Sequence, residues 1–276
     1  DQRRSADRRE AAEGSHGAHR RGGTVQGALT AMNATMTRVN GVFNRELALK
    51  LIIIADNDKV IFTDAATDPY SDLVDGDAPD AWSLELEQTV RTILGADKYD
   101  IGHLFGATGG GGSAGCIGCI GSNDTSTNIN PNCGNSPSPE NYKGSGYTSP
   151  GIDYYASGTY NQNSTAQLPP SGDAFDIDFV AHEMGHQLGD SHTYSFYEGF
   201  LNQEVEPGSG STIMGYAGIT GPSTDVQKHS DVYFHNVSIE QVQTNLVSVT
   251  ADVETPIANN PPVVAAMSTT YTIPKS

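Results

Sequence analysis

Three histidines and a glutamate in the stretch His182-Glu-Met-Gly-His186-Gln-Leu-Gly189-Asp-Ser-His192 have the types and spacing of a metal site. Residues four apart lie on one face of a helix, so His182 and His186 can direct their imidazoles at one ion. Imidazole nitrogen is a common zinc ligand, and three neutral imidazoles leave a fourth position for water. The stretch therefore predicts a Zn²⁺ site with His182, His186 and His192 as its ligands.

Glu183, next to the first predicted ligand, provides the group that a purely structural zinc site has no need of. Zinc lowers the pKa of a bound water toward ~7, and an adjacent carboxylate can take a proton as that water attacks a peptide carbonyl. The same carboxylate can then pass the proton to the leaving amine. Glu183 is therefore the predicted general base of a hydrolase.

His192 follows His186 by six residues, and a continuous helix turning about 100° per residue would direct it away from the metal. The chain must therefore bend between the two histidines. Gly189 lies where this bend is needed, because glycine adopts left-handed backbone angles without a steric cost from a Cβ atom. We expect the helix to end there, so that Gly189 supports the site.

An apolar stripe on the opposite side of the same helix predicts how the metal-binding face is held. The stripe follows helical spacing and would anchor a helix over residues 177–188 in a core while the histidines face a cleft. It consists of Ile177, Ala181, Met184 and Leu188. Asp176 is the predicted N-cap of this helix.

The extended motif resembles that of the metzincin metallopeptidases, H-E-x-x-H-x-x-G-x-x-H followed by a methionine-containing turn. Here Thr212-Ile-Met214-Gly-Tyr216 supplies the turn, and residues 24–250 are most similar to the bacterial reprolysin-like, adamalysin-related peptidases. The resemblance implies an α/β fold with a twisted, mostly parallel sheet. It also implies a long active-site helix in an upper subdomain and a small irregular lower subdomain after Gly189. Met214 would lie beneath the three imidazoles.

The same resemblance implies the activity of a zinc-dependent endopeptidase, with polypeptides as substrates and Zn²⁺ as cofactor. Tyr216 lies two residues after the methionine, where astacin-like and serralysin-like relatives place a tyrosine that can stabilise an oxyanion. The alternative is a catalytically silent, zinc-stabilised binding or adhesion module of a secreted protein. The presence of Glu183 favours the enzyme, because a binding module has no use for a general base.

Alternating helical and extended patterns predict the elements that position this site, and they favour an α/β sheet. Helices are expected over residues 25–43, 84–94, 177–188 and 238–247. Strands are expected over residues 47–55, 60–62, 99–105 and 146–149, and the resemblance assigns residues 114–120 to the edge strand that lies over the substrate.

The chain divides into three parts by composition. Residues 1–23 are rich in arginine, glutamate and glycine without apolar periodicity, which predicts a disordered tail. Residues 24–250 form the predicted catalytic domain. Residues 251–276 contain a proline-rich linker and are expected to begin a truncated following domain.

Net charge and cysteine content limit the partners and the compartment of the 276-residue chain. A formal charge of −18 at pH 7 disfavours binding to nucleic acid, and no apolar run is long enough to span a membrane. The three cysteines, Cys116, Cys119 and Cys133, suit one local disulfide and one remaining thiol. A zinc or redox Cys-x-x-Cys site is a weaker interpretation. We expect a secreted monomer.

Other titratable residues are interpreted as structural. His103, His229 and His235 lack the paired spacing of ligands, which favours ordinary hydrogen-bonded histidines. The acidic pairs Asp56/Asp58 and Asp75/Asp77 raise the secondary hypothesis of Ca²⁺ binding, although turn chemistry explains both.

Overall fold

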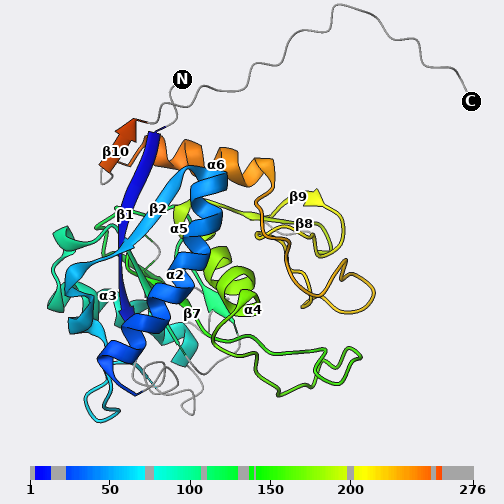
Figure 1. Ribbon diagram of the computed structural model, residues 1–276, viewed down its shortest axis with the longest axis horizontal. Helices are drawn as coiled ribbons and strands as arrows, with labels where there is room; N and C mark the ends of the chain where they lie inside the picture. The colour runs from blue at the N-terminus through cyan, green and yellow to red at the C-terminus, as the bar shows by residue number, and fades with distance from the viewer. Residues whose placement is uncertain are drawn as a thin grey trace, which may run out of the picture.

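The fold is an α/β arrangement in which helices cover a sheet of six strands (Figure 1). The computed structural model describes residues 4–13, 23–71, 78–106, 111–129, 137–139, 141–197, 202–249 and 253–256. None of the helices in these ranges has the length and hydropathy needed to cross a membrane.

The sheet has the strand order β10-β1-β3-β7-β4, and β2 pairs with β1. The pairs β1/β2, β1/β3 and β3/β7 are parallel, whereas β1/β10 and β4/β7 are antiparallel. The sheet is therefore mostly parallel, in agreement with the expected fold class. The strands are β1 (Arg4–Glu13), β2 (Leu49–Ile53), β3 (Ile101–Phe105), β4 (Gly112–Ser113), β7 (Gly146–Thr148) and β10 (Val253–Pro256).

Residues 173–188, here called the histidine helix, comprise three consecutive segments: α4 (Asp173–Phe175), the π-helical turn η4 (Asp176–Ala181) and α5 (His182–Leu188). π-Helical turns are rare and are frequent at functional sites. Two short strands, β8 (His192–Tyr194) and β9 (Asn202–Glu206), pair beyond this helix.

Helix α2 (Val25–Leu47) packs against the histidine helix in the main core. Thr24 caps its first turn, accepting from the Gly27 N–H, and the chain leaves it through Ala48 in the left-handed region. Its buried side chains follow helical spacing and share one apolar cluster with Ile177, Met184 and Leu188. The apolar stripe predicted from the sequence is thus the face that anchors the histidine helix.

Three further helices complete the framework. They are α3 (Ala78–Ile93), the short η3 (Ala96–Lys98) and α6 (Asn236–Val247). Trp82, Leu86 and Val90 of α3 pack with Tyr99 and Tyr142 in a second, smaller cluster. A separate two-stranded sheet pairs β5 (Thr127–Ile129) with β6 (Pro137–Pro139).

Two terminal segments differ from the prediction made for them. Arg4–Glu13, predicted to belong to a disordered tail, is strand β1 and pairs with β2, β3 and β10. Val253–Pro256, predicted to belong to a linker, is strand β10 of the same sheet. Both strands owe their conformation to pairing partners far away in sequence, and β structure depends strongly on such context.

Three local predictions are also wrong. Residues 60–62 form no strand, because a 3₁₀ helix, η1 (Ala55–Val60), runs into an isolated bridge at Ile61. The edge strand is Gly112–Ser113, upstream of the predicted residues 114–120. Asp176 is not an N-cap: it lies inside the histidine helix, where its carboxylate accepts a 2.8 Å hydrogen bond from the Thr35 hydroxyl.

Candidate active site

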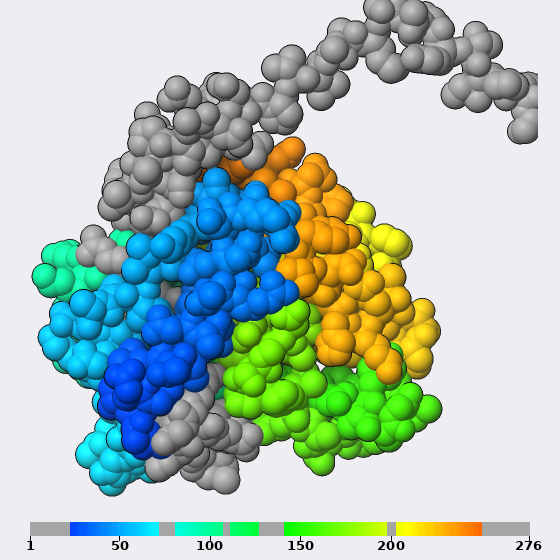
Figure 2. Space-filling model, viewed as in Figure 1, coloured from blue at the N-terminus to red at the C-terminus, as the bar shows by residue number. Residues whose placement is uncertain are grey.

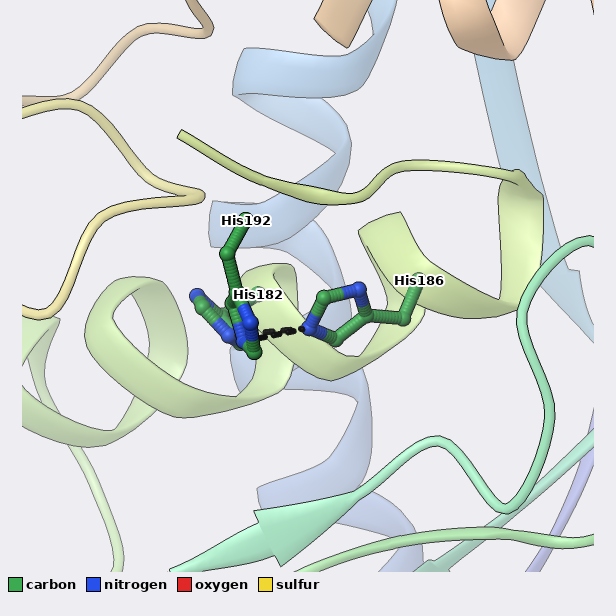
Figure 3. A group of neighbouring side chains, drawn as sticks. All are labelled: His182, His186 and His192. Carbon is green, nitrogen blue, oxygen red and sulfur yellow. Dashed lines mark hydrogen bonds between the residues drawn. The ribbon is translucent and has the colours of Figure 1, made fainter. Parts of the chain in front are cut away.

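The three predicted ligand side chains converge at one point, where their rings meet in Figure 3. Nε2 of His186 lies 3.1 Å from Nε2 of His182 and 3.0 Å from Nε2 of His192. Tetrahedral zinc with bonds of 2.0–2.1 Å separates its nitrogen ligands by about 3.3 Å. Both separations from His186 are close to this value, and all three ligand atoms lie within 4.8 Å of one another.

The outer ring nitrogens of two ligands fix the tautomer that metal binding needs. His182 Nδ1 lies 2.7 Å from the carbonyl oxygen of Ile213, and His186 Nδ1 lies 2.6 Å from that of Asp190. A carbonyl only accepts hydrogen bonds, so each Nδ1 carries the proton and each Nε2 presents a lone pair. Such lone pairs repel at 3 Å unless a cation lies between them, so this donor set fits a metal ion.

Gly189 makes the bend that brings in His192. Its φ of +123° lies in the region that favours glycine, and its N–H donates to the His186 carbonyl at 2.9 Å. The N–H of Asp190 donates to the Gly185 carbonyl at 2.9 Å, which closes the last turn of α5. The chain then reverses into β8, whose first residue is His192.

Glu183 lies between the histidine helix and edge strand β4. A β-carbon on Gly112 would lie 2.5 Å from its Cγ, so only glycine lets the strand approach this closely. Burial raises the pKa of Glu183 to about 8, while the N–H of Ala114 stabilises its ionised form. The side chain lines the same cleft as His182.

The methionine turn, residues 212–216, contacts both the histidine helix and the segment that carries His192, the third predicted ligand. Met214 is fully buried, and a β-carbon on Gly185 would lie 2.7 Å from its sulfur. The Met214 carbonyl accepts from the Thr193 N–H at 3.1 Å, next to His192. The turn therefore bonds to His182 directly, through the Ile213 carbonyl, and to Thr193, the residue that follows His192.

Tyr216 lies with its ring near two of the predicted ligands, at centroid distances of 5.6 Å from His182 and 4.6 Å from His192. Burial, followed by the nearby Tyr194 and Glu183, raises the pKa of its hydroxyl, so it is a proton donor at neutral pH. Tyr194 also stacks on His192 at 4.9 Å. Sequence reasoning missed Tyr194, although residues two apart on a strand share a face.

A cleft of ≈ 350 Å³ opens beside His182 and Glu183. Its walls come from β4, the histidine helix, residues 152–168 and residues 215–230, and they include Ile152, Tyr154, Tyr155, Leu168, Phe179, Tyr216 and Ile219. Sequence reasoning assigned no role to residues 152–168. The three tyrosines Tyr154, Tyr155 and Tyr160 in a polar stretch are the signal that could have indicated one.

The remaining histidines have ordinary partners. His103 is buried between the Gln187 amide oxygen and the Thr148 hydroxyl, each 2.7 Å away. His229 contacts Asp178 at 2.7 Å, and His235 accepts from the Val237 N–H. These contacts agree with their predicted structural roles.

Nothing in the described ranges supports a calcium site. The three histidines are the only group of three or more metal-ligating side chains that converge there. Asp56 forms an ion pair with Lys59 at 2.9 Å. Residues 75–77 lie outside the described ranges.

The local disulfide joins Cys116 and Cys119, and Cys133 lies outside the described residues. The disulfide turn contacts the end of the histidine helix, because the Gly118 N–H donates to the carbonyl of His186 at 2.8 Å. The cysteine pair is thus part of the framework around His186, the second predicted ligand.

The chain matches the sequence model of a known protein family. Residues 10–249 match the sequence model of the family described as Metallo-peptidase family M12B Reprolysin-like. No curated protein matches the sequence significantly. The matched range contains the three histidines, Glu183 and the methionine turn.

Proposed function

Because the chain belongs to the reprolysin-like metallopeptidases of family M12B, we propose that it is a zinc endopeptidase that hydrolyses internal peptide bonds of proteins. The observation that carries this proposal is the convergence of three imidazole nitrogens beside a buried carboxylate in an open cleft. An endopeptidase needs a cleft that accepts an extended chain at both ends. The edge position of β4 allows a substrate strand to pass alongside it.

His182, His186 and His192 would hold the metal, and Glu183 would manage the protons. Zinc, when bound, acts as a Lewis acid toward water and the peptide carbonyl. A cation beside Glu183 would lower its pKa again, so that the carboxylate can accept a proton from the attacking water and later deliver it to the leaving amine, serving as base and then as acid. The Glu183 side chain packs closely against Gly112 of β4, which holds the carboxyl in place beside the cleft.

Tyr216 is proposed to stabilise the negative charge that develops on the carbonyl oxygen. Its hydroxyl remains protonated at neutral pH and its ring packs on two ligands. A protonated hydroxyl at this place can donate to an oxyanion. The side-chain hydrogen bond with Tyr194 would have to exchange for one to the substrate.

We also propose that the protein works outside the cytosol as a monomer. The Cys116–Cys119 disulfide supports the compartment, because disulfides persist in oxidising surroundings. A secreted location also suits a peptidase whose substrates are other proteins.

Cleavage of an unfolded protein substrate by the zinc-loaded chain tests the proposal. We expect cleavage that a chelator abolishes and zinc restores, with internal cuts visible by mass spectrometry. Glu183→Ala should lower the rate by about 10²–10⁴-fold while zinc content stays the same. Glu240→Ala, on an exposed position of α6, is the matched control and should cleave normally.

The outcomes separate the enzyme from its alternative. Zinc-loaded wild-type protein that cleaves nothing would favour a silent binding module. Equal activity in Glu183→Ala would instead refute the assigned base.

A further inference from the structure

An aromatic group lies on the chain that folds back against the histidine helix. Figure 1 places β8 to the right of α5, and Figure 2 shows orange segments after the methionine turn beside the yellow-green histidine helix. Tyr194 ends β8, Phe196 follows it, and Tyr216 ends the methionine turn. Tyr194 contacts both other rings, at centroid distances of 4.7 Å from Phe196 and 4.5 Å from Tyr216. It is therefore the centre of the group.

Backbone hydrogen bonds hold both tyrosines to one short segment, residues 208–209. The N–H groups of Ser195 and Tyr216 donate to the two carbonyls of this segment, at 3.1 and 2.7 Å. On the other side of Tyr194, the Thr193 N–H donates to a carbonyl of the methionine turn at 3.1 Å. The Tyr194 side chain is also buried, at 7% exposure. Its ring is thus fixed within the group by the backbone on both sides.

The Tyr194 ring stacks on the imidazole of His192. Their centroids are 4.9 Å apart and their planes differ by 29°, whereas the Tyr216 ring meets the same imidazole steeply, at 4.6 Å and 68°. Offset-stacked and edge-to-face contacts are both favourable between aromatic rings. Groups that fix the orientation of a ligand ring also influence metal affinity. The two tyrosines therefore restrict the orientation from which His192 can bind a metal.

The hydroxyls of the two tyrosines interact as well. Burial is the main cause of the raised pKa of Tyr216, and a side-chain hydrogen bond to Tyr194 adds to it, so Tyr216 acts as the donor. Once the Tyr216 proton turns to an oxyanion, its oxygen can accept from the Tyr194 hydroxyl in return, because a phenol both donates and accepts. Hydrogen bonds arranged in such a chain strengthen one another.

Building on the proposed peptidase activity, we propose that Tyr194 is a positioning residue of the active site. Its ring fixes the imidazole of His192, and its hydroxyl holds the Tyr216 hydroxyl where that group can donate to the oxyanion. Tyr194 does not line the cleft beside Glu183. It therefore acts through the two side chains that are proposed to contact the metal and the substrate.

Tyr194→Phe tests the hydroxyl, because it keeps the ring. In the zinc-loaded protein it should lower kcat on a peptide substrate by about three- to tenfold with KM nearly unchanged, as expected for a group that acts on the transition state. In a Tyr216→Phe background the same change should have no further effect, because the hydroxyl that Tyr194 positions is gone. Steady-state kinetics of the four proteins complete this double-mutant cycle.

Tyr194→Leu tests the ring, and its readout is zinc affinity rather than activity. Removing the stacked ring should weaken zinc binding at least about fivefold in competition with a chromophoric chelator. Tyr194→Phe should bind zinc as the wild type does. Phe196→Leu is the matched control, because it removes a ring that packs on Tyr194 at 4.7 Å but leaves the ring stacked on His192 in place. It should leave zinc affinity unchanged.

The outcomes separate this inference from the proposed activity. Wild-type protein that cleaves no peptide would refute the peptidase and with it the role of the Tyr194 hydroxyl, while zinc affinity would still decide the role of the ring. Active wild type with an equal kcat in Tyr194→Phe, or an equal loss with and without the Tyr216 hydroxyl, would overturn the role of the Tyr194 hydroxyl alone.

The role of the ring has its own contradicting results. Zinc affinity that is unchanged in a folded Tyr194→Leu protein, or lowered as much by Phe196→Leu, would overturn it. Melting temperatures show whether each variant is folded. If Tyr194→Leu fails to fold, Tyr194→Met gives the same comparison with a longer apolar side chain.

Discussion

Asn245 of α6 lies so close to Gly189 that a β-carbon on the glycine would be 2.8 Å from the Asn245 Cβ. The Asn245 amide nitrogen also donates to the carbonyls of Leu188 and Gly118, at 2.9 and 3.2 Å. This one side chain therefore joins α6, the end of the histidine helix and the disulfide turn. The position of His192 depends on that junction, because the bend at Gly189 leads into β8.

Gly189→Val should weaken zinc binding by at least about tenfold and destabilise the fold by about 1–3 kcal/mol. The cause is a φ of +123° that a β-branched residue does not tolerate, combined with the close approach of Asn245. Zinc affinity is measured by competition with a chromophoric chelator, and stability by urea unfolding.

Gly41→Ala is the control for this substitution. A β-carbon there would meet nothing within 4 Å, and Gly41 lies inside α2, so alanine should stabilise the protein by up to about 1 kcal/mol. Unchanged zinc affinity in Gly189→Val would show that His192 reaches the metal without this bend.

Thr35→Val should lower the free energy of unfolding by about 1–3 kcal/mol, because it leaves the buried Asp176 without the hydroxyl that it accepts from at 2.8 Å. Thr37→Val, on the exposed side of α2, should change the stability by no more than about 0.5 kcal/mol. Equal effects in chemical denaturation would contradict a role for this bond in fixing the histidine helix.

His103 should make the protein sensitive to acid. Burial lowers its pKa from 6.5 to about 4, so below pH 6.5 the unfolded chain binds a proton that the folded protein refuses. The stability is therefore full above pH 6.5 and falls as the pH drops toward 4, by about 3 kcal/mol from this group.

The comparison that isolates this effect is between wild type and His103→Gln. Free energies of unfolding are measured at about pH 7 and about pH 4.5, and the difference between them should be smaller in the variant. Zinc release in acid affects both proteins alike. The same pH dependence in both would mean that other groups account for the acid sensitivity.

Tyr216→Phe should lower kcat by about 10²-fold or more with little change in KM, as expected for a donor that acts only on the transition state. Zinc content should stay the same, because the tyrosine is not among the predicted ligands. Steady-state kinetics on a peptide substrate measure this effect. An unaltered kcat would remove Tyr216 from the mechanism.

The residues of the site could be predicted because their geometry is local. The positions of His182, Glu183 and His186 follow from helix periodicity. The bend at Gly189 follows because a continuous helix would direct His192 away from the metal. The resemblance of the motif added Met214 and Tyr216, which are brought to the site by a turn that no periodicity reveals.

What could not be predicted depends on contacts between distant segments. The polar composition of residues 4–13 gives no strand pattern, yet backbone pairing with three other strands makes them β1. Aspartate is a residue type that often caps helices, and the sequence predicted Asp176 as a cap for that reason. In the fold, α2 places Thr35 beside Asp176, and the two side chains form a buried hydrogen bond. Tyr155 of the cleft wall is likewise fixed by a bond to Asp225, 70 positions away in the sequence.

Strand β2 joins the sheet through β1 alone among the described strands. A recombinant form that started at residue 24 would lack β1. Strand β2 would then have a row of unsatisfied backbone donors and acceptors along the side that pairs with β1. Exposed edges of this kind pair with other chains. The shortened protein should therefore self-associate even with all of its catalytic side chains present, and the N-terminal boundary for expression belongs ahead of Arg4.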